Sequence, residues 1–548
     1  SGAGYASFGV THVEAYANGD FAAYLDANGA SINCSSLTVS TTYSAKANAR
    51  TTQSAGSVDA SVISGKVNIA SAYVYTVAAA AVMGKKGAGA VDAAVITGDL
   101  TVTTTGTAVA SAEVEHPSVT LTGINIAANI LTATAQSSQT AYLSNANIKA
   151  ANIAVTSNYN QGATDAASGG ARAVLRGTGD GVGLALVGTE VNTASATAAA
   201  DSWAYISGTY IVAGTGGVSI QSVGTSLASA VVEQKSDAGL AGFGITVVKA
   251  DADGSYQAYL DATGATVNAQ SLSVTTTYTA KAVAETTQST KGGVTASAAA
   301  GKVNKADAKV AISAGASVRG SVVGGSISGT VAIGGAVNVK ASGTAHALAC
   351  VQEPNKTLSG IDVAANVINA ELGATQSARI QNVNLTAGAV SVLSELNKGK
   401  TDGATATLSG SGTGVTLVEA NVNTATATAN NTANAFVEGA AITCSSISVK
   451  VDATSHALTE TKDESSIGFA GLGVTVVEAK ANGTFSAYLK TSSVTAGSGG
   501  VGVYIAYTSS AGAEASQPEG GAVEISGVSI EGNKATATAG TAASAYID

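Results

Sequence analysis

Residues 141–155 read AYLSNANIKAANIAV, and this stretch decides the fold because the chain repeats it. It opens with Ala141-Tyr142-Leu143 and, after a short turn, closes with Ile148-x-Ala150-x-x-Ile153-x-Val155. Similar stretches recur around an aromatic residue or an arginine, at Tyr24, Tyr142, Tyr205, Tyr259, Arg379, Phe436, Tyr488 and Tyr546. Repetition at a regular interval is typical of stacked structural units. We therefore predict these eight residues to be repeat-defining structural positions, with no catalytic, cofactor-binding or metal-binding residue among them.

The spacing of these positions predicts the organisation of the chain. Most gaps are between 52 and 63 residues and two are about double, which indicates a unit of roughly 58 residues with degraded copies near residues 75–100 and 315–335. A longer period is visible where residues 10–15 reappear, with changes, at 245–250 and 474–479. We expect a first super-repeat at residues 1–241 and a second at 242–467, each with four units of which one is degraded. A truncated third would occupy residues 468–548.

The composition indicates an ordered β protein. Only 3 prolines and 1 tryptophan occur in 548 residues, and 45% of residues are apolar although only 4% are aromatic. The apolar mass is therefore mostly Ala and Val, which suits sheets that lie close together. Alternation with period two, as in Thr132-Ala133-Thr134-Ala135 and residues 424–428, predicts strands with Thr on one face and Ala on the other.

These observations predict an all-β, elongated β-solenoid (β-helix-like) made of the 58-residue units. With two strand layers per unit, it would be a rod of about twenty layers and about 100 Å. Turns are expected at Asn18-Gly19, Asn28-Gly29, Asp253-Gly254 and Asn482-Gly483. Two alternatives are weaker: the Ala-rich residues 77–83 could form a helix, and tandem immunoglobulin-like sandwiches could hide in the long repeat. The chain lacks the Trp, Tyr-corner and Pro-linker pattern of such sandwiches.

The two ends of the sequence lie inside the repeat. Ser1 is not an initiator methionine, and Phe8-Gly9-Val10-Thr11 begins at the same point of the repeat as Phe243-Gly244-Ile245-Thr246. The chain stops at Asp548, directly after another copy of the phrase. We expect both ends to be cuts through a longer array. No apolar run approaches the roughly 20 residues of a membrane-spanning helix.

Residues with reactive side chains are few and scattered. Cys34 and Cys444 occupy the position that is alanine in other copies, so we expect small core residues there, and three cysteines cannot build a disulfide framework. The four histidines (His12, His116, His346 and His456) are never at the spacing of metal ligands, and His12 is expected to be an ordinary strand residue. The sequence therefore predicts no enzyme and no cofactor.

Acidic turn residues raise one alternative. Calcium could bind at turns through Asp251 and Asp253, Asp99 or Asp180-Gly181, but the Gly-Gly-x-Gly-x-Asp signature of calcium-binding β-rolls is absent, so turn-forming Asp is favoured. A net charge of −10 argues against nucleic acid as a partner. Sequons such as Asn430-Asn431-Thr432 leave glycosylation open.

The repeated wording resembles that of large repetitive bacterial exoproteins, such as the filamentous-haemagglutinin-like and leukotoxin-type filamentous adhesins. Residues 431–437 with Ile442-x-Cys444-x-x-Ile447-x-Val449 carry the likeness best, and residues 473–479 also fit. The resemblance implies a secreted β-helical shaft displayed on the bacterial cell surface. It carries over no functional residue, because such shafts act through length and surface.

We therefore expect an extracellular structural or adhesive shaft whose outer Thr, Ser and Asn faces are hydrated. It would self-associate, end to end or laterally, into a filament and would contact host or neighbouring cells. A phage-type or trimeric β-helical stalk is the main alternative, and it would need an apolar outer stripe. An ice-binding solenoid or a β-helical polysaccharide-active enzyme is less favoured, because Thr-x-Thr pairs are irregular and charged residues make up only 11% of the chain.

Overall fold

The computed structural model describes fourteen segments of the chain, in which thirty strands and no helix occur. The described residues are 3–27, 31–52, 58–84, 94–115, 119–176, 184–234, 238–288, 294–353, 356–401, 403–410, 415–462, 467–490, 493–516 and 528–548. The turn predicted at Asn28-Gly29, together with His116 and Asp180, lies outside these residues.

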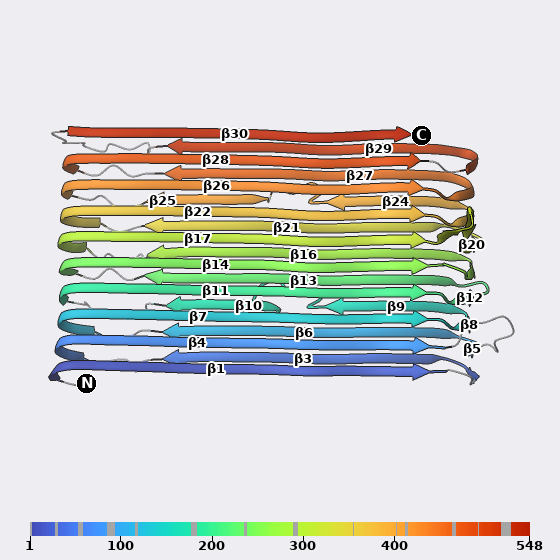
Figure 1. Cartoon of the computed structure of the whole chain (residues 1–548), viewed down its shortest axis with the longest axis horizontal. Helices are drawn as coiled ribbons and strands as arrows, with labels where there is room; N and C mark the ends of the chain where they lie inside the picture. The colour runs from blue at the N-terminus through green and yellow to red at the C-terminus, as the bar shows by residue number, and fades with distance from the viewer. Residues whose placement is uncertain are drawn as a thin grey trace.

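The first sheet contains ten long parallel strands that follow one another in chain order (Figure 1). They are β1 (Ala3–Asp26), β4 (Val58–Met83), β7 (Val119–Ser144), β11 (Leu184–Ser207), β14 (Ala238–Asp261), β17 (Val294–Arg319), β22 (Lys356–Gln381), β26 (Val415–Glu438), β28 (Ile467–Lys490) and β30 (Val528–Ile547).

The second sheet runs in the opposite direction and has eighteen strands, again paired in parallel (Figure 1). They are β2 (Ile32–Cys34), β3 (Leu37–Thr52), β5 (Ala94–Ile96), β6 (Asp99–Glu115), β8 (Asn147–Lys149), β9 (Asn152–Tyr159), β10 (Gly170–Arg176), β12 (Tyr210–Val212), β13 (Gly217–Gln234), β15 (Thr266–Ala269), β16 (Ser271–Gln288), β20 (Thr330–Ile333), β21 (Val337–Glu353), β23 (Asn384–Thr386), β24 (Ala389–Leu396), β25 (Ala404–Gly410), β27 (Ala441–Lys462) and β29 (Ser493–Ser516). A small antiparallel hairpin, β18 (Ser321–Val323) with β19 (Ser326–Ser328), lies between β17 and β20 in the chain.

The predicted all-β solenoid is confirmed, but its expected dimensions are wrong. Each unit is one coil that adds one rung to each sheet, so the ten coils stack over only about 45 Å at ~4.8 Å per rung. A 24-residue strand extends over about 80 Å at ~3.3 Å per residue. The molecule is therefore a flattened slab whose long axis follows the strands (Figure 1). Two layers per unit would have required strands half as long.

Residues 77–83 belong to β4, so the helical alternative is wrong for them. They pair on one side with β1 and on the other with β7 over the whole stretch. Small side chains fit the crowded positions of a central strand, where Ala80, Ala81 and Val82 are completely buried. Hydrogen bonding on both edges thus overrides the helix propensity of alanine.

The interior is built from rows of identical or similar residues that face the opposite sheet. The expected Thr/Ala alternation is present: Ala133 and Ala135, and likewise Ala425 and Ala427, are buried and alternate with partly exposed threonines. Another inward row is polar and reads Thr11, Asn68, Asn129, Asn192, Thr246, Asn304, Asn366, Asn423, Thr475 and Asn533.

Within this asparagine ladder each side-chain amide bonds to the next coil. Asn68 Nδ2 donates to Asn129 Oδ1 at 2.9 Å, and Asn129 Nδ2 donates to Asn192 Oδ1 at 2.8 Å. The same chain of bonds runs through Asn304, Asn366 and Asn423. Such ladders satisfy buried amides that would otherwise be costly. Threonine interrupts the ladder at every fourth coil.

The four-coil period also appears in aromatic pairs that cross the interior. Aromatic rings pair in coils one, five and nine, with centroid distances of 5.1 Å for Phe21–Tyr43, 5.6 Å for Tyr256–Tyr278 and 5.9 Å for Phe485–Tyr507. The first two pairs are stacked and the third is tilted. Next to Tyr43 and Tyr278 in the following coil are Gly106 and Gly343. A Cβ at either glycine would overlap the tyrosine ring. Each ring therefore occupies space that the neighbouring coil leaves open.

The Asn-Gly and Asp-Gly pairs at Asn18, Asp253 and Asn482 are not turns but lie within β1, β14 and β28, so these three predictions are wrong. Their glycines precede the inward aromatic residues of coils one, five and nine. A Cβ at Gly254 would lie 2.7 Å from the ring of Tyr256. Glycine is required here for the space it leaves and not for a left-handed backbone.

The corners after several long strands have a residue with a positive φ, which is glycine in coils four and eight and asparagine in coils three and seven. Asn145 (φ 50°) and Asn382 (φ 52°) follow the long strands of coils three and seven. In the same two coils the second-sheet strand is split, after β9 and after β24, by loops that begin at Asn160 and Asn397. Asn160 Oδ1 accepts from the backbone N–H of Ala108 at 2.9 Å, and Asn397 Oδ1 accepts from that of Ala345 at 2.7 Å. These side chains replace the ladder bonds that the split removes.

Candidate functional site

The eight repeat-defining residues lie in one row on the outer face of the first sheet. Pairing places Tyr24, Ala81, Tyr142, Tyr205, Tyr259, Ser317, Arg379, Phe436, Tyr488 and Tyr546 on successive strands. Ala81 and Ser317 fall within the two intervals where degraded copies were expected. In the inner coils the residues on either side of a member face the interior and are buried, as Ala141 and Leu143 are beside Tyr142. The row is an outward aromatic ladder beside the corner of every coil.

The rings of this ladder stack face to face. Tyr142, Tyr205 and Tyr259 have centroids 5.0 and 4.8 Å apart, and the Phe436–Tyr488 and Tyr488–Tyr546 pairs are at 4.9 and 5.1 Å. Because each inner ring is covered on both faces, only its edge meets solvent. A sugar ring could therefore not stack on these faces, and the ladder is suited to stabilising the stack of coils.

Arginine continues the ladder where the aromatic residues are missing. The guanidinium of Arg319 lies 4.4 Å from the Tyr259 centroid, and its Nε donates to Asp261 Oδ2 at 3.2 Å. Arg379 is half-buried beside it. Burial lowers the pKa of Arg379, and the neighbouring Arg319 charge lowers it further. Arg319, two residues after Ser317 of the row, thus covers one face of the Tyr259 ring by a cation–π contact.

Three inner tyrosines of the ladder, Tyr142, Tyr205 and Tyr488, are poor nucleophiles. Burial, and then the neighbouring Tyr259 and Tyr142, raise the pKa of Tyr205 to about 12. Burial also raises the pKa of Tyr142 and Tyr488. A phenol that holds its proton this tightly cannot supply a phenolate near neutral pH, so the ladder has no evident chemistry of its own.

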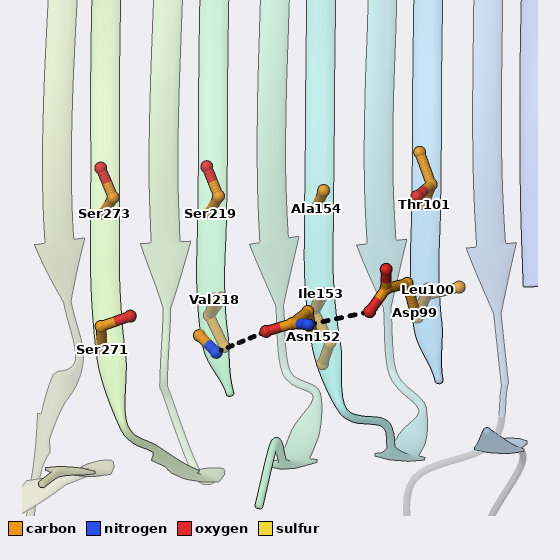
Figure 2. Close-up of a pocket in the computed structure, with 11 residues that line it drawn as sticks. Asp99, Leu100, Thr101, Asn152, Ile153, Ala154, Val218, Ser219, Ser271 and Ser273 are labelled. Carbon is orange, nitrogen blue, oxygen red and sulfur yellow. Dashed lines mark hydrogen bonds between the residues drawn. The ribbon is translucent and has the colours of Figure 1, made fainter. Parts of the chain in front are cut away.

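A shallow groove lies on the outer face of the second sheet (Figure 2). It has a volume of about 300 Å³ and crosses the starts of β6, β9, β13 and β16. Asn152 lies at its centre: its Nδ2 donates to Asp99 Oδ1 at 2.8 Å and its Oδ1 accepts from Gly217 N at 3.0 Å. Ser271 continues the rung. Asp99 is thus the only acidic residue lining the groove, which offers a hydroxyl and amide surface and no calcium cage.

The other acidic candidates for calcium lie in strand β14. The Asp251 carboxylate pairs with Lys249 Nζ at 2.7 Å, which explains its place on a strand surface. Burial raises the pKa of Asp253, and the Asp251 charge raises it further. Among the described residues no group of three or more His, Cys, Asp or Glu lies close enough together to hold a metal ion. The prediction that the protein has no cofactor stays a prediction.

The cysteines and described histidines are dispersed. All three cysteines are free thiols: Cys444 and Cys350 are buried, and Cys34 packs partly buried against the core. Burial raises the pKa of Cys350 and Cys444, which makes them weak nucleophiles. His12 is an outward residue of β1, as expected, with Nε2 3.0 Å from Glu14 Oε1.

One feature of the surface was missed from the sequence. Toward the start of the long strands the outer face of the first sheet is apolar over all ten coils, where a hydrated Thr, Ser and Asn surface was expected. Its best-exposed members include Phe8, Ile126, Phe243, Val363 and Leu472. The sequence contains a signal for this face, because residues two apart in a strand lie on the same side of the sheet. Phe8 and Val10 are therefore on the same face as Glu14, which is an outward strand position.

Comparison with protein-family models, with curated proteins and with solved structures gave no match. The class that the fold defines is a two-sheet parallel β-solenoid. Within the described segments there is no helix of the length and apolarity needed to cross a membrane.

Proposed function

We propose that the chain is a structural and adhesive β-solenoid shaft of a bacterial cell-surface protein. The observation that carries the proposal is the continuity of its ladders. Equivalent positions stay aligned through all ten coils of the first sheet, so that the aromatic, asparagine and alanine rows recur from strand to strand with few replacements. A protein whose repeated positions serve stacking is suited to length and stiffness. The resemblance to secreted filamentous adhesins supports the extracellular location.

The proposed partners follow from the same architecture. The edge of a solenoid presents unpaired backbone N–H and C=O groups, so coils of one copy can continue the sheets of another. We propose self-association into a filament, and contact of its surface with host or neighbouring cells. The groove around Asn152 is the place where a polar ligand such as a glycan would find several hydroxyl and amide groups together.

Immunogold electron microscopy of the producing bacterium, with antibodies against residues 1–548, tests the location. We expect label on intact cells, on thin projections, and loss of label after protease treatment of the cell surface. Antibodies against a cytoplasmic protein serve as the control and should label only permeabilised cells. Label restricted to permeabilised cells would rule out a surface shaft.

Adhesion is tested separately with beads coated with the folded chain or with heat-unfolded chain. We expect only the folded coat to bind cells, because a ladder surface exists only in the stacked state. Equal binding by both coats would contradict an adhesive role and leave a purely structural one.

A further inference from the structure

The outer face of the first sheet has a region that contains almost no polar side chain. It comprises three neighbouring outward rows, called here the apolar face. Its first row is Ala6, Ile63, Ile124, Val187, Ala241, Ala299, Ile361, Val418, Ala470 and Val528. The second is Phe8, Gly65, Ile126, Thr189, Phe243, Gly301, Val363, Ala420, Leu472 and Ile530. The third is Val10, Val67, Ala128, Val191, Ile245, Val303, Ala365, Val422, Val474 and Gly532. Thr189 is its only polar residue.

Most large side chains of the apolar face are exposed and do not serve the core of their own chain. Phe243 is 51% exposed, Ile126 51% and Val363 49%. The inward residues of the same rungs are small or polar, for example Gly9, Lys66 and Glu190. The usual amphipathic pattern of a strand is therefore inverted here. Among the residues that the structure describes, no element packs on this face.

The surface is flat as well as apolar. The ring of Phe243 lies along the sheet over Gly301, since a Cβ added to that glycine would be 2.9 Å from Phe243 Cδ1. Phe8 covers Gly65 in the same way. Large rings laid over glycines leave an even surface of the kind that packs sheet against sheet at about 10 Å.

We propose that the apolar face pairs laterally with the apolar face of a second copy of this chain. Three rows, about 6.7 Å apart, on ten strands at ~4.8 Å cover about 900 Å². A stable interface needs about 800 Å² from each partner, so the face is large enough alone. Isolated soluble proteins rarely expose a contiguous apolar area of this size. The pairing stands on this face and does not depend on a location at the cell surface.

Charge at the border of the face favours a protein partner over a lipid surface. The three outward rows that follow the apolar face carry charges of both signs that pair with each other: Lys305 with Asp307 at 2.8 Å, and Glu478 with Lys480 at 2.7 Å. The chain as a whole has a net charge of −10. It therefore offers no basic rim for anionic headgroups. Opposite charges that are paired within one copy do not repel a second copy of the same chain.

Sedimentation equilibrium of the full chain tests the pairing. We expect twice the 52.8 kDa mass of one chain at micromolar concentration. The double variant Ile126→Glu, Val363→Glu places two charges in the centre of the face and should raise the dissociation constant at least about a hundredfold, because a buried charge without a partner is costly.

A matched control keeps the test specific. Gln136→Glu with Thr375→Glu adds the same charges to exposed positions of the same strands, β7 and β22, outside the apolar face. This variant should sediment like the parent chain. Circular dichroism checks that both variants are folded. We expect them to fold because the substituted residues lie on the surface.

Three results would overturn the proposal. One is a parent chain that stays a single chain at micromolar concentration, and another is a three-chain mass, which would fit a trimeric stalk. A third is a single chain that floats with phosphatidylcholine vesicles while the Glu variant does not, since lipid would then be the occupant. End-to-end growth is recognised separately, because scattering would show a particle longer in the stacking direction and not a doubled thickness. None of these readings depends on the immunogold result.

Discussion

Glycines opposite tyrosine rings are the residues on which the packing of successive coils depends most directly. Gly343 lies beside Tyr278, which is 2% exposed, stacks on Tyr256 and donates to Gln376 Oε1 at 3.3 Å. The ring cannot move away, because both its face and its hydroxyl are held. A side chain at residue 343 must therefore displace the coil itself.

We predict that Gly343→Ala lowers the free energy of unfolding by about 3 kcal/mol or more, at the upper end of overpacking effects. Gly188→Ala in β11 is the control, since nothing lies within 4 Å of its Cβ position. Denaturant unfolding followed by circular dichroism measures both. Similar stability of the two variants would mean that the tyrosine ring is not fixed.

The buried carboxyl group of Glu190 makes the stability of the fold depend on pH. Burial raises the pKa of this carboxyl above its ordinary value of 4.5, and the Asn192 side chain opposes the shift only in part. Its ladder neighbours are Ala127 and Gly244, so no adjacent rung supplies a positive charge. The folded chain thus binds this proton more tightly than the unfolded chain. The contribution of Glu190 to stability is full below pH 4.5 and is lost as the pH rises through the raised pKa.

We therefore expect Glu190→Gln to raise the unfolding temperature at pH 7 and to leave it unchanged at pH 4. Glu395→Gln is the control of opposite sign: partial burial raises the pKa of Glu395, but hydrogen bonds from Lys340 and Lys398 lower it overall. This second variant should lose stability at pH 7 and lose less as the pH falls. Calorimetry at both pH values measures the unfolding temperatures of the two variants. A lower unfolding temperature of Glu190→Gln at pH 7 would contradict the raised pKa of Glu190.

At the scale of the strand, the asparagine ladder can be tested with a substitution that already occurs at equivalent positions of other coils. Asn129 accepts a bond from Asn68 and donates one to Asn192, all at 4% exposure or less. Coils five and nine carry Thr246 and Thr475 at the same position. Threonine is thus accommodated in this row.

Asn129→Ala should cost about 2 kcal/mol, because it removes two bonds and leaves buried amide groups with fewer partners. Asn129→Thr should cost clearly less, since a hydroxyl remains to bond along the row. Thermal unfolding of the two variants gives the order. If alanine were as good as threonine, the ladder would contribute little to stability.

The strands also show what sequence can predict here. Repetition of Ala141-Tyr142-Leu143 and its relatives identified eight of the ten positions in the outward row, because hydrogen bonding in parallel register aligns equivalent residues. Turn positions were harder to predict from the sequence, since glycine occurs both in turns and in strands where it leaves space for a neighbouring ring. Gly254 before Tyr256 makes room for a ring, and no local pattern distinguishes this from a turn. The left-handed corner at Asn145 carries no glycine at all.

At the scale of the molecule, sequence predicted a stack of repeats but neither its shape nor its apolar face. The number of layers per unit depends on where a strand of 24 residues ends, and the expected turns at Asn18 and Asn482 cut these strands short. The groove around Asn152 could not be predicted from a local sequence pattern either, because four successive coils contribute residues to it. Both features arise only when coils are placed side by side.

The super-repeat makes a prediction about the whole stack. Ala238 and Ile467 start equivalent long strands, and the aromatic pairs recur in coils one, five and nine. Deleting residues 238–466 therefore joins coil four to coil nine, where Tyr507 takes the place of Tyr278 beside Gly224. We expect this six-coil protein to fold cooperatively, with an unfolding temperature within a few degrees of the parent chain.

Deleting only residues 238–295 removes one coil and keeps the strand register, but it brings Gly224 against Gly343 without a ring between them. Each such void costs roughly 1 kcal/mol or more, and the buried partners of Tyr278 lose their bond. This nine-coil protein should therefore unfold at a lower temperature than the shorter six-coil one, although it is longer. Calorimetry of the two deletions measures the order. The reverse order would mean that the single coil, and not the group of four, is the unit in which the interior is packed.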